Sequence, residues 1–88
     1  MNGPATCVMV TASGAIKASP GMLFAVVLTS AAAAQISVLD GGASGTEIVG
    51  LRLGAAGSAT FAPGVPVAFS KLYIVLDAGT AEISAVYQ

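Results

Sequence analysis

Short runs in which apolar side chains alternate along the chain constrain the fold more than any other feature. Residues 22–28, 35–39 and 72–77 show this period of two, which is typical of β-strands, and similar runs occupy most of the sequence. Gly or Pro interrupts the chain at short intervals, so no segment has the length or periodicity of a stable helix. The sequence therefore predicts an all-β fold, a small antiparallel β-sandwich or jelly roll of about seven to eight short strands.

Turn signals between the runs predict how the strands connect. Residues 6–11 and 14–18 are expected to form a first hairpin around Ser13 and Gly14. At the other end of the chain, residues 72–77 are expected to pair with residues 82–87 through a connection at 77–80. Further strands are expected at residues 22–28, 35–39, 46–53, 59–61 and 67–69.

One part of the sequence resembles another. Residues 23–27 followed by 34–39 are similar to residues 72–76 followed by 81–86, so the same hairpin is expected to occur twice. Two interpretations are open. The match reflects a repeated hairpin, whose two copies would occupy equivalent places in the two sheets, or it is a chance match between strands built from few residue types.

Charged side chains are rare for a chain that folds alone. Only 8% of the 88 residues carry charge, against about 25% in average domains, while 56% are hydrophobic. This composition excludes intrinsic disorder, and single scattered charges offer no basic patch for nucleic acid. We expect one sandwich domain at residues 6–88 after a flexible N-terminal arm at residues 1–5. Two classes of protein have such a composition: membrane proteins, and proteins that bury their surface against copies of themselves or a partner.

The membrane interpretation rests on residues 18–39, which contain no charge and are long enough to cross a bilayer as a helix. Pro20 and Gly21 break this segment, polar residues interrupt it, and no Lys or Arg cluster flanks it. The same segment resembles a signal peptide, but it begins too far into the chain and has one basic residue ahead of it. Alternating strands explain the segment better than either reading, and no membrane partner is expected.

Residues suited to catalysis or metal binding are scarce. The chain has no His, one cysteine, Cys7, and four acidic residues that are isolated in sequence. A general acid or base needs a group poised near neutral pH, and a nucleophilic cysteine needs an activating partner. The glycine-rich tract at residues 41–45 lacks the Lys-Ser/Thr pair of a phosphate-binding loop and precedes a strand instead of a helix. We therefore predict no enzyme, no catalytic residue, no cofactor and no metal site.

Four segments carry a resemblance to a known family. Residues 20–24, residues 40–46 followed by Ile48, residues 61–69 followed by 72–75, and residues 81–87 resemble small β-sandwich virion structural proteins of tailed bacteriophages. Lys71 departs from the family pattern, in which a glycine commonly precedes the Leu-Tyr pair. These motifs are strand and turn patterns, and none is a catalytic signature.

The resemblance implies a non-enzymatic capsid decoration (cement) protein that binds and stabilises the phage head. It implies the major capsid protein as partner, a homo-oligomer with a trimer favoured, and a place on the capsid surface of the virion after synthesis in the host cytoplasm. The alternatives are a tail or head-fibre subunit and a glycan-binding module. A glycan-binding module would expose aromatic side chains or a carboxylate-rich metal site.

Partner contacts are expected outside the core. Alternation places Phe24, Val26, Ile36, Val38, Val75 and Ile83 in the sandwich interior. The N-terminal arm and two loops are the candidates for contact. Chain ends and loop tips without their own packing tend to be disordered until a partner holds them. The candidate partner-contact residues are Asn2, Gly3, Pro4, Ala5, Asp40, Gly41, Gly42, Ser44, Gly54, Ala55 and Gly57.

Overall fold

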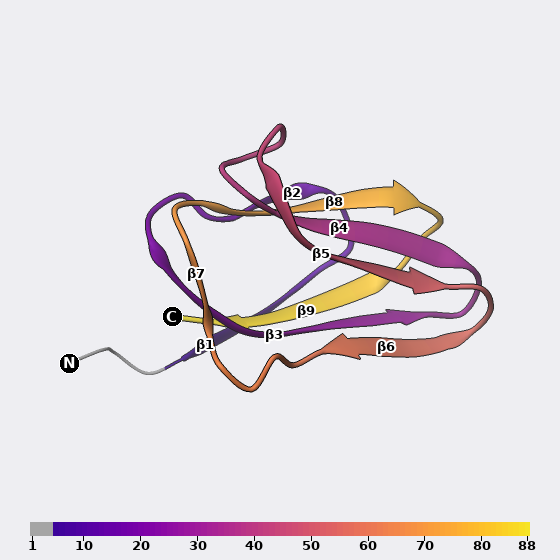
Figure 1. Cartoon of the computed structure of the whole chain (residues 1–88). Helices are drawn as coiled ribbons and strands as arrows, with labels where there is room; N and C mark the ends of the chain where they lie inside the picture. Colours follow the sequence, from indigo (N-terminus) through magenta and orange to yellow (C-terminus); the bar gives the residue numbers. More distant parts are fainter. Residues whose placement is uncertain (1–4) are drawn as a thin grey trace.

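Nine strands in two antiparallel sheets make up the computed structural model, which describes residues 5–88 (Figure 1). The strands are β1 (Thr6–Val10), β2 (Gly14–Lys17), β3 (Gly21–Ser30), β4 (Ala34–Asp40), β5 (Thr46–Leu53), β6 (Gly57–Phe61), β7 (Val67–Phe69), β8 (Leu72–Ala78) and β9 (Glu82–Tyr87). Sheet A has the order β1-β9-β3-β6, with β7 also paired to β3, and sheet B has the order β2-β8-β4-β5. The predicted all-β sandwich is confirmed.

Residues 18–39, the segment with the length of a membrane span, form β3 and β4 with the turns beside them. Within the part of the chain that the structure describes, no helix is long and apolar enough to cross a membrane.

The predicted terminal hairpins are wrong. β1 pairs with β9 and β2 pairs with β8, so the turn around Ser13 carries the chain from sheet A to sheet B. The connection from β8 to β9 likewise crosses between the sheets. About three extended residues span the roughly 10 Å between packed sheets, so a short connection serves an arch as well as a hairpin.

The internal similarity corresponds to a structural repeat. The repeated units are arches and not the predicted hairpins, because each unit has one strand in either sheet. The two arches pair with each other, β3 with β9 and β4 with β8. Their registers correspond, since Val27 lies opposite Ser84 and Val75 lies opposite Ser37. The two units therefore have equivalent pairings, but each spans both sheets instead of forming a hairpin within one sheet. The sequence match aligns Val27 with Leu76, one residue away from its structural counterpart Val75.

The two arches contact each other at one end of the sandwich. The Ser30 hydroxyl donates a hydrogen bond to the carbonyl oxygen of Thr80 at 2.7 Å. Gly79 has a φ of +79°, and a Cβ atom there would collide with the carbonyl oxygen of Ala33. The packing of the repeated units thus depends on a glycine in the second arch.

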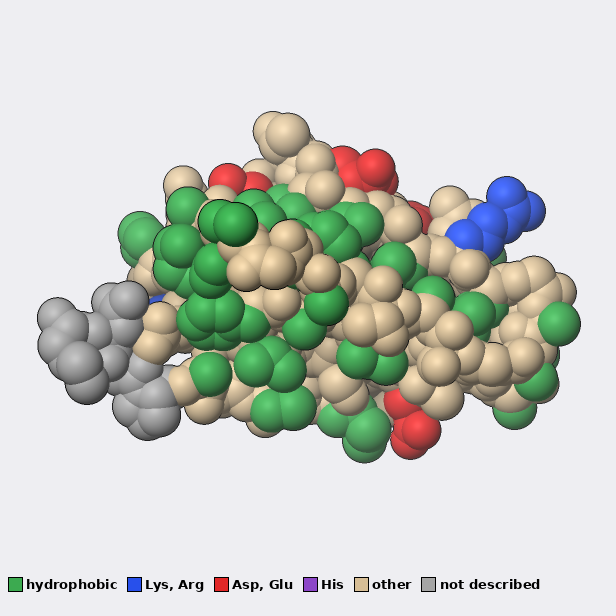
Figure 2. Space-filling view, turned by 60° about the horizontal axis from the view of Figure 1, so that its bottom comes forward, with side chains coloured by type: hydrophobic (Ala, Val, Ile, Leu, Met, Phe, Trp, Pro, Cys, Tyr) green, Lys and Arg blue, Asp and Glu red, His purple; other side chains and the backbone are tan. Residues whose placement is uncertain are grey.

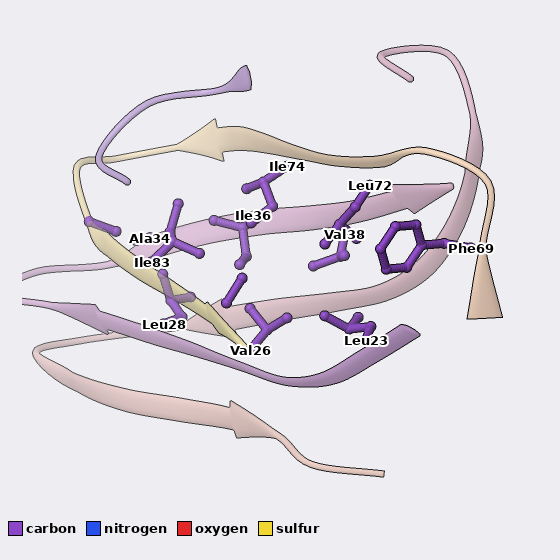
Figure 3. Packing of buried hydrophobic residues seen from close by; sticks show 12 residues of the cluster. Leu23, Val26, Leu28, Ala34, Ile36, Val38, Phe69, Leu72, Ile74 and Ile83 are labelled. Atoms are coloured by element: carbon purple, nitrogen blue, oxygen red, sulfur yellow. The ribbon is translucent and has the colours of Figure 1, made fainter. Parts of the chain in front are cut away.

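Side chains from both sheets meet in one hydrophobic core (Figure 3). The largest fully buried side chains are Leu23, Val26, Leu28, Ile36, Val38, Leu72, Ile74 and Ile83. Four of the six predicted core residues are among them: Val26, Ile36, Val38 and Ile83. No polar or charged side chain is buried within residues 5–88, so apolar side chains form the interface between the sheets.

Phe24 and Val75 do not belong to the core, contrary to the prediction. Against β9, the register shifts between Leu23 and Ala25, which makes Phe24 the extra residue of a β-bulge. The bulge turns Leu23 inward and leaves Phe24 half-buried outside the core cluster. Val75 lies between Ile74, which is fully buried, and Leu76, so it faces outward from sheet B.

Candidate assembly surface

The seven charged residues are divided unevenly between the two sheets. Glu82, at the start of β9, is the one charged residue on a strand of sheet A. The other six lie on strands of sheet B or directly beside them: Lys17, Asp40, Glu47, Arg52, Lys71 and Asp77. The outward surfaces of a repeated fold therefore differ in character, although the two halves of the core are equivalent.

Apart from Glu82 at the start of β9, uncharged side chains form the outer face of sheet A. Directly opposite residues on neighbouring strands point to the same side of a sheet, so the pairing gives cross-strand rows. One row contains Cys7, Val86 and Ala25, and the next contains Met9, Ser84, Val27 and Thr60. In Figure 2, which brings the sheet A side forward, hydrophobic and uncharged polar atoms cover most of the visible surface. We call this outer face of sheet A, defined by these two rows, the uncharged face.

The outer face of sheet B is polar by comparison. Ser37 and Asp77 lie there, and the Ser37 hydroxyl donates a hydrogen bond to the Asp77 carboxylate at 2.6 Å. Arg52 lies opposite Gln35 on the neighbouring strand, and both side chains are exposed. Charged and hydrogen-bonded groups of this kind are costly to strip of water, so this face suits contact with solvent.

The edges of the two sheets differ in the same way. On sheet B, β2 contains Lys17 and a register shift against β8, and β5 contains Glu47 and Arg52 with a shift against β4. Charges and bulges at sheet edges hinder pairing with another strand. On sheet A, β1 carries no charge and pairs with β9 through five consecutive residues without a shift. The far edge of sheet A is divided between β6 and β7 by residues 62–66, which include Pro63 and Pro66.

Exposed large hydrophobic side chains border sheet A. Among the described residues, Met9 on β1 is 58% exposed and Val65 in the β6–β7 connection is 77% exposed. The free thiol of Cys7 is also exposed on β1. Met9, Cys7, Val27 and Val86 were not among the predicted contact residues. The absence of charge from residues 6–10 was the available signal, but it acquires meaning only once β1 is known to be an edge.

The predicted contact loops lie at opposite ends of the β4–β5 pair. Asp40 pairs with Thr46 beside the first loop, whereas Ala34 pairs with Leu53 beside the second. Ser44, Gly54, Ala55 and Gly57 are exposed. The two loops therefore do not form one patch.

Asp40 is occupied by contacts within the chain. Its Oδ1 atom accepts hydrogen bonds from the backbone N–H groups of Ser70 at 2.7 Å and Lys71 at 3.2 Å. Gly41 donates its N–H to the carbonyl oxygen of Lys71 at 3.0 Å, and Gly41 and Gly42 have φ values of +112° and +98°. This turn fastens the β4–β5 connection to the start of β8. Of the predicted N-terminal arm, Ala5 is exposed, whereas Asn2, Gly3 and Pro4 lie outside the described residues.

Polar groups do not converge into a reactive centre. A shallow groove of about 720 Å³ at the arch end is lined by Thr11, Thr29, Ser30, Ala31, Thr80, Ala81 and Glu82. Its Ser30 hydroxyl already donates to Thr80 and accepts from the N–H of Ala32 at 3.2 Å. Within residues 5–88, no cluster of three or more His, Cys, Asp or Glu side chains could hold a metal ion.

No family model matches the chain, and no curated protein matches it. Among solved structures, a chain from Bacillus endospore appendages, described as forming a novel family of disulfide-linked pili, is similar. The two chains share 16% sequence identity, the match covers 96% of this chain and 84% of the other, and the TM-score is 0.45. A likeness at this level supports no statement about what this chain does.

Proposed function

We propose that the chain is a non-enzymatic structural protein that assembles on a protein surface through the uncharged face. The division of charge carries this proposal, because six of the seven charged residues lie on or beside sheet B and leave sheet A free of all but Glu82. Apolar surface with few charges is cheap to remove from water and marks interfaces on small proteins. The open edge at β1 adds backbone groups that a partner strand could satisfy.

The specific form that we propose is decoration of a phage head. The proposal is supported by the resemblance of four segments to small virion β-sandwiches, and by a small β-sandwich fold with one hydrophobic core. The major capsid protein is the proposed partner, and self-association is part of the proposal. A protein that binds only the assembled shell stabilises it by mass action, by an amount that grows with occupancy.

The residues also favour a structural role over an enzymatic one. No histidine is present in the sequence, and two of the four carboxylates, Asp40 and Asp77, already accept hydrogen bonds from the chain itself. Three of the five aromatic side chains are unsuited to glycan binding, since Phe69 is buried and Phe61 and Tyr87 pack against the core, while Phe24 and Tyr73 are half-buried outside it.

Imaging tests the location. Antibodies raised against the purified chain should label the heads of phage particles from the source that encodes it, at many sites on each shell. Labelling confined to tails or fibres would replace decoration with the fibre alternative. Particles that carry no label, in a preparation where the protein is abundant, would refute a virion role.

A further inference from the structure

β1 is the described edge best suited to pairing with another strand. All five of its residues are uncharged, and each pairs in sequence with β9, from Thr6 with Tyr87 to Val10 with Ile83. The β2 and β5 edges are bulged and charged, and the β6 and β7 edge is interrupted by two prolines. Natural sheets usually protect an edge with such features, and β1 has none of them.

We propose that β1 pairs antiparallel with β1 of a second copy, so that two sheets A join into one continuous sheet across a twofold axis. This inference deepens the proposed assembly function and rests on it. The side chains fix the permitted registers. Val8 and Val10 pack against the core, so Cys7 and Met9 point to the uncharged face. Twofold pairing must keep the two outer faces on the same side, so one residue of β1 has to lie directly opposite its own counterpart, with the twofold axis between them.

Centring the pair on Val8 uses the whole strand. Thr6 then lies opposite Val10 of the second copy, and Cys7 lies opposite its Met9. All five residues are paired, which gives about four to six new backbone hydrogen bonds. Centring on Cys7 or on Met9 would pair only three of the five strand residues. The Val8 register also covers part of Met9, whose side chain is 58% exposed in the single chain.

The partner is a second copy because the strand complements itself. Both members of each opposing pair are uncharged, and Cys7 and Met9 of the two copies gather into one apolar cluster on a continuous uncharged face. Twofold pairing closes on itself and leaves no further β1 edge for growth. The unit is therefore a dimer, whereas the family resemblance favours a trimer.

Charge substitutions at Cys7 and Met9 test the register directly, because both side chains lie outside the core. Cys7→Lys/Met9→Lys places lysines opposite each other at two positions. Cys7→Glu/Met9→Lys introduces the same number of charges but places each glutamate opposite a lysine, and it serves as the matched control. Cys7→Glu/Met9→Glu, mixed with the double-lysine variant, restores opposite charges across the axis.

Sedimentation velocity of the full chain, in reducing buffer and over a range of concentrations, gives the masses. The wild type and the Glu/Lys variant should be dimers. Each like-charge variant alone should dissociate at least about tenfold more readily, and their mixture should recover the dimer. Circular dichroism should show the same β-fold in every variant.

Three results would overturn the proposal: a monomeric or trimeric wild type, a double-lysine variant that remains dimeric, or a Glu/Lys variant that dissociates as readily as the double-lysine one. These experiments use the free protein alone. A failed dimer would therefore leave the location on a particle to be decided by imaging, and unlabelled particles would leave the dimer unaffected.

Discussion

Two glycines with the same φ angle allow the packing of the two arches to be measured. Gly79 and Gly64 both have a φ of +79°, a conformation that costs a residue with a side chain about 1–2 kcal/mol. A Cβ atom at Gly64 meets nothing within 4 Å, whereas one at Gly79 would collide with the carbonyl oxygen of Ala33 in the other arch. Gly64→Ala therefore isolates the conformational cost, and Gly79→Ala adds the displacement of a packed connection.

The expected difference follows from these two contributions. Gly64→Ala should lower the free energy of unfolding by about 1–2 kcal/mol, and Gly79→Ala by about 2–5 kcal/mol, because overpacking adds about 1–3 kcal/mol. Urea denaturation followed by far-ultraviolet circular dichroism, at one fixed protein concentration, measures both. Equal destabilisation by the two substitutions would show that the arches do not pack through Gly79.

Other substitutions test the core and its turns by the same denaturation assay. Leu23→Ala and Leu72→Ala remove equivalent, fully buried side chains and should each cost about 2–5 kcal/mol. Phe24→Ala, at the bulge, should cost less than either, and a larger loss would place Phe24 in the core after all. Asp40→Ala deprives the N–H groups of Ser70 and Lys71 of their acceptor and should cost about 1–3 kcal/mol, whereas no loss would show that the turn holds without it.

Local patterning predicted the strands well because their limits are set by nearby residues. The predicted bounds of β5 and β7 agree with the structure, since glycine-rich turns flank β5 and a proline-containing turn precedes β7. The prediction of core residues failed at the β-bulge in β3. Nothing in residues 22–28 marks Phe24 as the extra residue of a bulge, because the bulge is defined by the register against β9, about 60 residues away.

The connections and the candidate surface depended on information that a local pattern does not contain. A turn at Ser13 is compatible with a hairpin and with an arch, and the pairing of β1 with the last strand decides between them. The uncharged face was not predicted for the same reason. Alternation divides each strand into two faces, but only the assignment of strands to sheets reveals that Glu82 is the sole charged residue on sheet A.

Assembly through the uncharged face of sheet A can be tested at a matched pair of positions that the structural repeat supplies. Val27 on sheet A and Val75 on sheet B are half-buried, each faces outward, and each lies opposite a serine of the other unit. Val27→Lys and Val75→Lys thus place the same charge at equivalent points on the two faces.

The decisive measurement is the occupancy of purified phage heads, titrated with wild-type protein and with each variant. We expect Val75→Lys to bind like the wild type and Val27→Lys to bind at least about tenfold more weakly. Equal binding by the two variants, or a loss confined to Val75→Lys, would contradict the assignment of the assembly surface to sheet A.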